Sequence, residues 1–253
     1  MRRLSALHEN VRFLANSRAV AQDFRKLSSR ADVRVLYNGI DVERFAPGQG
    51  DPDWLAGEAR LAPPPADCVC FGLVGTYAHW KGHVLFIQAA GALRSRRPDL
   101  RLRFYIVGGP IYATQGSQVS VNELLECSAR VGVSDCLGFV PFQAEMPRVY
   151  RSLNVVVHAS TKPEPFGLVI VEAMACGLPV IVSNAGGAAE LFQHGENALG
   201  FALGDSLALA AQMERLAVDA ELRRALGAHA RVHAGAHFAL DRLGKELAAA
   251  YDT

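Results

Sequence analysis

The sequence lacks an excess of charge of either sign, long apolar runs and an apolar leader. Its 26 Lys and Arg residues nearly balance 25 Asp and Glu, so no overall field draws the chain to nucleic acid or to an anionic membrane. No stretch of about eighteen apolar residues occurs that could cross a membrane as a helix. The residues after Met1 do not form the apolar core of a signal peptide. We therefore expect a cytoplasmic protein whose contact with a membrane is peripheral at most.

The sequence also has little that would bind a metal ion or form disulfides. None of its five cysteines belongs to a C-x-x-C pair and all lie in apolar stretches, which predicts buried, reduced thiols. His79 and His83 are spaced four apart without a third ligand. The arginines between Arg94 and Arg103 have no interleaved aromatic side chains that could stack on bases. We predict no metal, no cofactor and no nucleic-acid partner.

What the sequence does contain is a regular alternation of strand and helix patterns. Half of its 253 residues are apolar, enough for a sizeable core. Short apolar or β-branched runs separated by helical patterns predict a Rossmann-like α/β fold, a parallel sheet with helices on both faces. Ligands of such sheets bind beyond the carboxyl ends of the strands. The predicted strands are Val33–Tyr37, Val69–Val74, Leu102–Val107, Val155–His158 and Val180–Val182.

Composition divides the chain into three parts. Residues 1–45 hold too little structure to close a domain alone, and we interpret them as the end of a larger domain. Residues 46–66 include proline- and glycine-rich stretches typical of a linker or a surface excursion. Residues 67–253 form the main domain, and its alanine- and leucine-rich end from Ser206 onward predicts two or three helices.

The most informative stretch begins at Glu164 and lies between two predicted strands. Gly167 lets the backbone approach a ligand, and the helix after it presents free N–H groups and the positive end of its dipole. We expect the backbone of Phe166, Gly167 and Leu168 to bind a phosphate. Glu172 falls one to two turns into the helix, where its carboxylate can accept hydrogen bonds from ribose hydroxyls. Glu164 precedes the helix, nearer to a reacting sugar.

Several motifs together resemble the family 4 glycosyltransferases, which have the GT-B fold. Glu164 and Glu172 enclose seven residues, as in the family's E-x7-E motif. Asn38–Asp41 is similar to the segment that joins the two GT-B domains, and Gly72–Gly82 to the strand and loop that hold the donor diphosphate. The resemblance covers nearly the whole chain. It implies that the chain is chiefly the C-terminal, donor-binding half, with residues 1–45 a remnant of the N-terminal domain.

The resemblance also implies a reaction and the residues that perform it. A sugar would pass from a nucleoside diphosphate sugar to a saccharide or glycolipid acceptor, with retention at the anomeric carbon, in the cytoplasm or at the inner face of its membrane. Lys81 would bind the diphosphate and take part in catalysis. Glu172 would hold the ribose. Glu164 would be catalytic by positioning the donor sugar.

Three further positions are implied to contact the donor. Thr76 stands where the family has an arginine, and a neutral side chain there weakens the expected phosphate clamp. Gly108 belongs to a glycine turn after a strand, which allows a close approach to the donor. Val140 belongs to the stretch Leu137–Phe142, which we interpret as a turn that lines the base pocket through its main chain.

Several readings of the whole chain stay open. It is an active transferase completed by a separate chain that carries the N-terminal domain, a nucleotide-sugar-binding module without turnover, or a truncated enzyme. A nucleotide-sugar epimerase would bind a similar ligand at the edge of a parallel sheet, but the E-x7-E stretch favours transfer.

Overall fold

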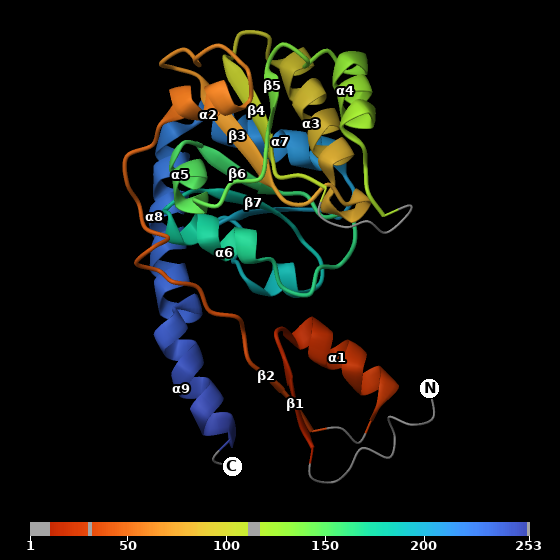
Figure 1. Cartoon of the computed structure of the whole chain (residues 1–253), viewed down its shortest axis with the longest axis vertical. Coiled ribbons are helices and arrows are strands. Elements are labelled where there is room, and N and C mark those ends of the chain that lie inside the picture. The colour runs from red at the N-terminus through yellow and green to blue at the C-terminus, as the bar shows by residue number, and fades with distance from the viewer. Residues whose placement is uncertain (1–10, 30–31, 111–116, 252–253) are drawn as a thin grey trace.

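The centre of the molecule is a six-stranded sheet in which every strand runs parallel to its neighbours (Figure 1). The computed structural model describes residues 11–29, 32–110 and 117–251 of the chain. The predicted α/β class and parallel sheet are thereby confirmed. In spatial order the strands are β5 (Leu137–Val140), β4 (Leu102–Val107), β3 (Val69–Val74), β6 (Val155–His158), β7 (Val180–Ser183) and β8 (Leu199–Phe201).

Helices cover both faces of this sheet, because its strands alternate apolar side chains between two cores. Phe71 and Leu73 of β3 lie in one core, whereas Cys70 lies in the other. The first core packs against α3 (His83–Arg96), α4 (Val121–Arg130) and α7 (Ser206–Val218). The second packs against α2 (Pro52–Glu58), α5 (Met146–Arg151), α6 (Leu168–Ala175) and α8 (Ala220–Phe238).

Two strands of the sheet differ from the sequence interpretation. β5 occupies the stretch that we interpreted as a turn, and β8 was not predicted. Each is short and contains a glycine, Gly138 or Gly200, which lowers the strand propensity of the run. Both glycines serve packing: a Cβ on Gly138 would lie 2.5 Å from Ala59 Cβ, and one on Gly200 would lie 2.8 Å from the ring of Phe192.

The segment 46–66, interpreted as a linker or surface excursion, contains the helix α2. The Asp51 side chain caps this helix by accepting a hydrogen bond from Trp54 N at 3.0 Å, and Pro52 occupies its first turn. Leu55 and Ala56 are fully buried against the main domain. The helix is only seven residues long, too short to produce a recognisable apolar period in the sequence.

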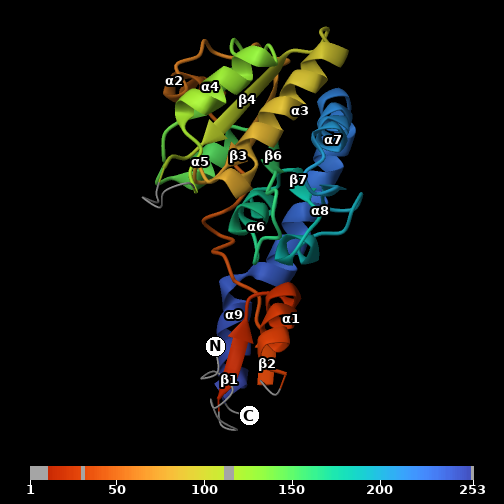
Figure 2. The same ribbon diagram turned by 90° about the vertical axis from the view of Figure 1, so that its right-hand side faces the viewer.

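The N-terminal region, here residues 11–29 and 32–37, forms a small unit at one end of the molecule. β1 (Arg12–Ala15) and β2 (Asp32–Val35) pair in parallel and are joined through α1 (Arg18–Leu27). The last helix, α9 (Leu240–Tyr251), lies beside them (Figures 1 and 2). Arg12 donates to Ala250 O at 3.0 Å, and Arg242 donates to Tyr37 O at 2.7 Å. The N-terminal region therefore packs against the last described helix, a contact that the division by composition did not foresee.

The end of the chain forms three helices, α7, α8 and α9, within the predicted range. α8 is the longest of them at 19 residues, and it runs from the main sheet towards the N-terminal region (Figure 1). In the parts of the chain that the structure describes, no helix is both long and apolar enough to cross a bilayer.

Candidate functional site

The loops after β3 and β6 meet at the carboxyl edge of the sheet, where the ligand site was predicted. After β3 the chain enters the short helix η2 (His79–Lys81) and turns at Gly82, whose φ is +77°. A Cβ at Gly82 would lie 1.8 Å from Ala159 O, so only glycine fits this contact. Thr161 N donates to Trp80 O at 2.7 Å. The loop that carries Lys81 is thus fixed against the segment that follows β6.

Lys81 and Glu164, the two residues predicted to be catalytic, form an ion pair. Their side chains are 23% and 13% exposed, respectively, so most of the pair is shielded from water. An ion pair in such a place interacts more strongly than one on the surface. The sequence separation of 83 residues is bridged by the adjacency of β3 and β6 in the sheet.

Two further side chains hold the Glu164 carboxylate, and the sequence analysis missed both. His158 Nε2 lies 2.6 Å from Glu164 Oε2, and Ser160 Oγ donates to the same oxygen at 2.6 Å. His158 is the last residue of β6, and Ser160 follows it closely. Polar residues directly after a buried apolar strand, at the edge where ligands bind, were the available signal.

The surroundings of Glu164 favour its ionised form. Burial alone raises its pKa, but the hydrogen bond with His158 and the charges of His158 and Lys81 outweigh burial and hold the pKa well below 4.5. A carboxyl with so low a pKa does not donate a proton near neutral pH. It can orient a polyhydroxyl ligand by accepting hydrogen bonds, and it can stabilise positive charge.

The start of α6 has the geometry predicted for a phosphate site. Gly167 precedes the helix with a φ of +113°, and no side chain caps the first turn. Ile170 N donates to Gly167 O at 3.0 Å. The N–H groups of Leu168 and Val169 have no acceptor among the described residues and are left for an external one. Phe166 is 2% exposed, with ring centroids 6.2 Å from Tyr37 and 5.9 Å from Phe238. Its side chain therefore anchors the loop, and only its backbone can face a ligand.

Glu172 lies on α6 with one carboxylate oxygen already engaged. Tyr150 Oη donates to Glu172 Oε2 at 2.7 Å, and Oε1 has no hydrogen-bond partner among the described residues. Burial raises the pKa of Glu172, and the hydrogen bond from Tyr150 opposes that rise. Burial also raises the pKa of Tyr150, which keeps its hydroxyl a donor. Sequence reasoning missed Tyr150, since an aromatic residue on a short buried helix looks like any core residue.

Thr76, Gly108 and Val140 lie at the same edge as Lys81. Thr76 is partly exposed in the loop after β3. Gly108 N donates to Val140 O at 2.9 Å, and a Cβ on Gly108 would lie 2.1 Å from Gly75 O. The φ of Gly108 is +143°, a conformation that favours glycine. Val140 is fully buried, and it reaches this edge only through its carbonyl oxygen, which accepts the hydrogen bond from Gly108.

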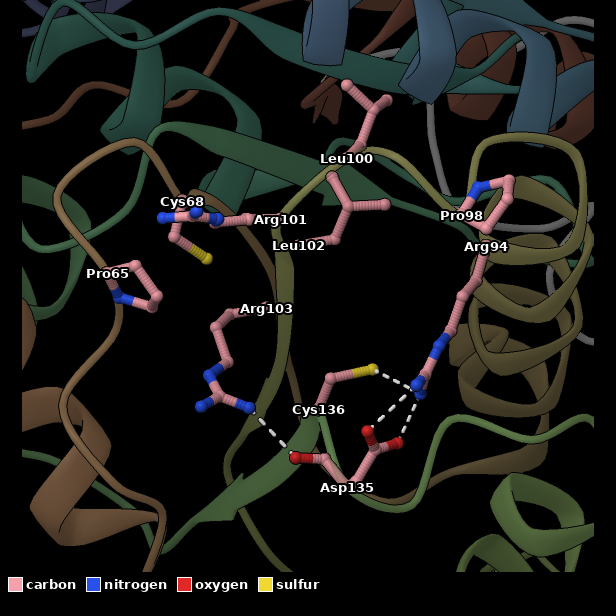
Figure 3. Close-up of a pocket in the computed structure, with 10 residues that line it drawn as sticks. All are labelled: Pro65, Cys68, Arg94, Pro98, Leu100, Arg101, Leu102, Arg103, Asp135 and Cys136. Carbon is pink, nitrogen blue, oxygen red and sulfur yellow. Dashed lines mark hydrogen bonds and ion pairs between the residues drawn. The ribbon is translucent and has the colours of Figure 1, made fainter.

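A depression of about 240 Å³ lies at the opposite edge, beside the amino ends of β3, β4 and β5 (Figure 3). Arg94 and Arg103 line it, and both are engaged: Arg94 pairs with the Asp135 carboxylate, and Arg103 donates to Asp135 O at 2.8 Å. None of the predicted site residues borders it. In the described ranges, no group of three or more His, Cys, Asp or Glu side chains could hold a metal ion.

Known proteins resemble this chain in sequence and in structure. A D-inositol 3-phosphate glycosyltransferase of Actinosynnema mirum is 34% identical over 251 residues, which are 95% of this chain and 57% of that protein. Anabaena HepE, solved with UDP and glucose, superposes with a TM-score of 0.83 at 29% identity, over 95% of this chain and 62% of that one. Sucrose-phosphate synthase from Thermosynechococcus elongatus gives a TM-score of 0.78 at 26% identity, over 94% and 57%.

The chain spans about half the length of the curated relatives it matches. The similarity therefore extends to the part of each relative that this chain matches, and it does not extend to the rest of the relative. The family model for glycosyl transferases group 1 matches residues 65–233, which contain Thr76, Lys81, Glu164 and Glu172. Since this match covers most of the chain, the protein belongs to the glycosyl transferases group 1 family.

Proposed function

We propose that the chain binds a nucleoside diphosphate sugar and is the donor-binding half of a retaining glycosyltransferase. The observation that carries this proposal is the shielded ion pair of Lys81 with Glu164 beside the uncapped start of α6. One cation and one set of free N–H groups suit a diphosphate. A carboxylate held ionised between them suits the sugar attached to it.

Lys81 would change partners when the donor binds. A diphosphate oxygen competes with Glu164 for the Lys81 ammonium, whereas Glu164 keeps His158 and Ser160 as partners. When the bond from the anomeric carbon to the diphosphate breaks, its electron pair stays on the leaving oxygen. Lys81 and the start of α6 would stabilise that negative charge, and ionised Glu164 would stabilise the positive charge left on the sugar.

Glu172 would bind the ribose through the carboxylate oxygen that Tyr150 leaves free. Tyr150 orients the carboxylate, because its buried hydroxyl has Glu172 as its hydrogen-bond acceptor. Gly108 would border the base, Val140 would support it by accepting the hydrogen bond from Gly108 N, and Thr76 would add a neutral hydrogen bond to the phosphates. HepE was solved with UDP and with UDP-glucose, which makes uracil the first base to test.

Retention of configuration and the class of acceptor are part of the same proposal and rest on the E-x7-E resemblance. The acceptor would be a saccharide or a glycolipid. Turnover would also require a surface that binds the acceptor, either on a separate chain or on a longer form of this one. A donor-binding module without turnover would have the same site but would not release the sugar to an acceptor.

Calorimetric titration of the chain with UDP, GDP and ADP tests the donor site. We expect saturable binding of one nucleotide, weakened at least about tenfold by Lys81→Ala and by Glu172→Ala, because each removes a charged hydrogen-bond partner. Lys245→Ala, which removes an exposed lysine of α9, is the matched control and should bind as the parent chain does. Absence of binding at millimolar nucleotide, or equal loss in the control, would contradict the proposal.

A further inference from the structure

The first turn of α1 is capped by a residue from a distant part of the chain. Glu190 Oε2 accepts a hydrogen bond from Arg18 N at 2.9 Å, and Oε1 accepts one from Ala19 N at 2.8 Å. Ser17 Oγ accepts the next one, from Val20 N at 3.1 Å. α1 has no acidic residue of its own in that turn. Glu190 therefore supplies the negative charge that complements the helix dipole.

The same carboxylate holds a second element of the N-terminal region. Tyr37 Oη donates to Glu190 Oε2 at 2.8 Å. Burial and the neighbouring Glu190 raise the pKa of Tyr37, so its hydroxyl stays a donor at neutral pH. The Tyr37 ring also packs 6.2 Å, centroid to centroid, from Phe166. Glu190 thus joins α1 and the segment after β2 at one point.

Glu190 ends the short helix η3 (Gly187–Glu190), whose first residues are fixed to the loop that carries Glu164. Gly187 N donates to Glu164 O at 2.7 Å, and Gly186 pairs with Glu164 as an isolated parallel bridge. A Cβ on Gly187 would lie 2.0 Å from Pro165 O and 2.9 Å from Ser17 Cβ. The helix η3 is therefore in tight contact with both the Glu164 loop and the start of α1.

We propose that Glu190 is a positioning residue that couples the N-terminal region to the Glu164 loop. By fixing α1 and Tyr37 to η3, it would set the place of Glu164 relative to the donor sugar, although it touches no substrate itself. The inference rests on the proposed donor site, because Glu164 is the group whose position it sets. It predicts that removing the Glu190 carboxylate lowers the contribution of the sugar to the binding affinity. The contribution of the nucleotide should stay the same.

Two measurements on the full chain test this role. Amide hydrogen exchange, without ligand, should become faster at Arg18 and Ala19 in Glu190→Ala and also at Gly187, whose N–H contacts Glu164. Calorimetry should show that the gain in affinity from UDP to UDP-glucose falls about tenfold while UDP affinity is unchanged, the effect of losing hydrogen bonds to a charged group. Glu190→Gln keeps the size of the side chain and one acceptor oxygen. It should therefore show smaller changes than Glu190→Ala in both measurements.

Asp219→Ala provides the matched control. The Asp219 side chain caps the N terminus of α8 by accepting from Leu222 N at 2.8 Å. Its removal should destabilise the chain without changing exchange at Gly187 or the gain from UDP to UDP-glucose. Faster exchange at Arg18 and Ala19 alone, with Gly187 and the sugar gain unaltered, would make Glu190 a plain helix cap and overturn the inference. If the parent chain binds UDP-glucose no better than UDP, the exchange rate at Gly187 decides: unchanged exchange in Glu190→Ala would overturn the inference. If the parent chain binds no nucleotide, the proposed function is contradicted instead.

Discussion

Glu164 remains charged although most of its side chain is shielded from water. Its partners Lys81, His158 and Ser160 are what make this possible, since an isolated buried carboxylate would take up a proton instead. Removing one partner of such a group costs more free energy than the pair contributes net, because the other charge is left without compensation. A single substitution at Glu164 or at one of its partners should therefore lower the stability of the site.

Glu164→Gln should lower the free energy of unfolding at neutral pH and make it depend less on pH in the acidic range. Because the folded-state pKa of Glu164 lies below 4.5, its ionisation adds stability that is present above that pH and is lost as the pH falls towards the folded-state pKa. We expect a loss of about 1–3 kcal/mol at pH 7 that shrinks below pH 4.5. Urea denaturation from pH 7 to pH 3 measures it. Stability curves that stay parallel would contradict the prediction; Glu43→Gln, at an exposed carboxylate, is the control.

At the scale of elements, the site depends on how closely neighbouring loops approach each other. Gly82 directly precedes α3 and approaches the backbone after β6, and Gly108 approaches the backbone after β3. Both have positive φ angles, so two separate constraints, conformation and space, require glycine. Close main-chain contacts therefore fix the loops that carry Lys81 and Gly108.

Gly82→Ala and Gly132→Ala separate these two constraints. Both glycines have similar φ angles, +77° and +72°, but a Cβ would collide with Ala159 O at Gly82 and meet nothing within 4 Å at Gly132. Gly132→Ala should cost about 1 kcal/mol from backbone strain alone. Gly82→Ala should cost roughly 3 kcal/mol or more and displace Lys81, which weakens UDP binding. Thermal unfolding and calorimetry measure both; equal losses in the two variants would show that space at Gly82 is not limiting.

At the scale of the whole molecule, the chain passes twice between the main sheet and the N-terminal region. The segment after β2 leads into the main domain, and α8 and α9 return along it (Figures 1 and 2). Arg231 of α8 donates hydrogen bonds to Val42 O, Phe45 O and Ala175 O at 2.8, 3.0 and 2.9 Å. One guanidinium thus ties the incoming segment, the end of α6 and the returning helix together.

Arg231→Met should destabilise the chain by about 2–4 kcal/mol, since three carbonyl groups lose a charged donor while the apolar part of the side chain is retained. Arg224→Met on the same helix is the comparison. Arg224 is 68% exposed and, among the residues that the structure describes, pairs with Glu221 alone, so its loss should stay within about 0.5 kcal/mol. Chemical denaturation measures both variants. A similar, small effect at the two positions would mean that Arg231 does not tie the segments together.

The sequence alone determined the features that depend on neighbours along the chain. The strands β3, β4 and β6 have the predicted bounds, and the glycine turn into α6 is where the motif placed it. Such patterns are local because a strand or a helix start is set by a few adjacent residues. The edge that carries Lys81 and Glu164 followed from the rule that ligands bind at the carboxyl ends of parallel strands.

Only the tertiary structure decided which distant groups meet. Tyr150 contacts Glu172, and Glu190 contacts Arg18 across a separation of 172 residues, each between different elements. His158 and Ser160 lie six and four residues from Glu164, but the path of the loop after β6 decides that they meet its carboxylate. β5, β8 and α2 were missed because packing overrides weak local propensity in short elements. The sequence shows whether a side chain is apolar or polar, but it does not show which residue that side chain contacts. Its partner is set by the order of the strands and by the close backbone contacts at Gly82, Gly108 and Gly187.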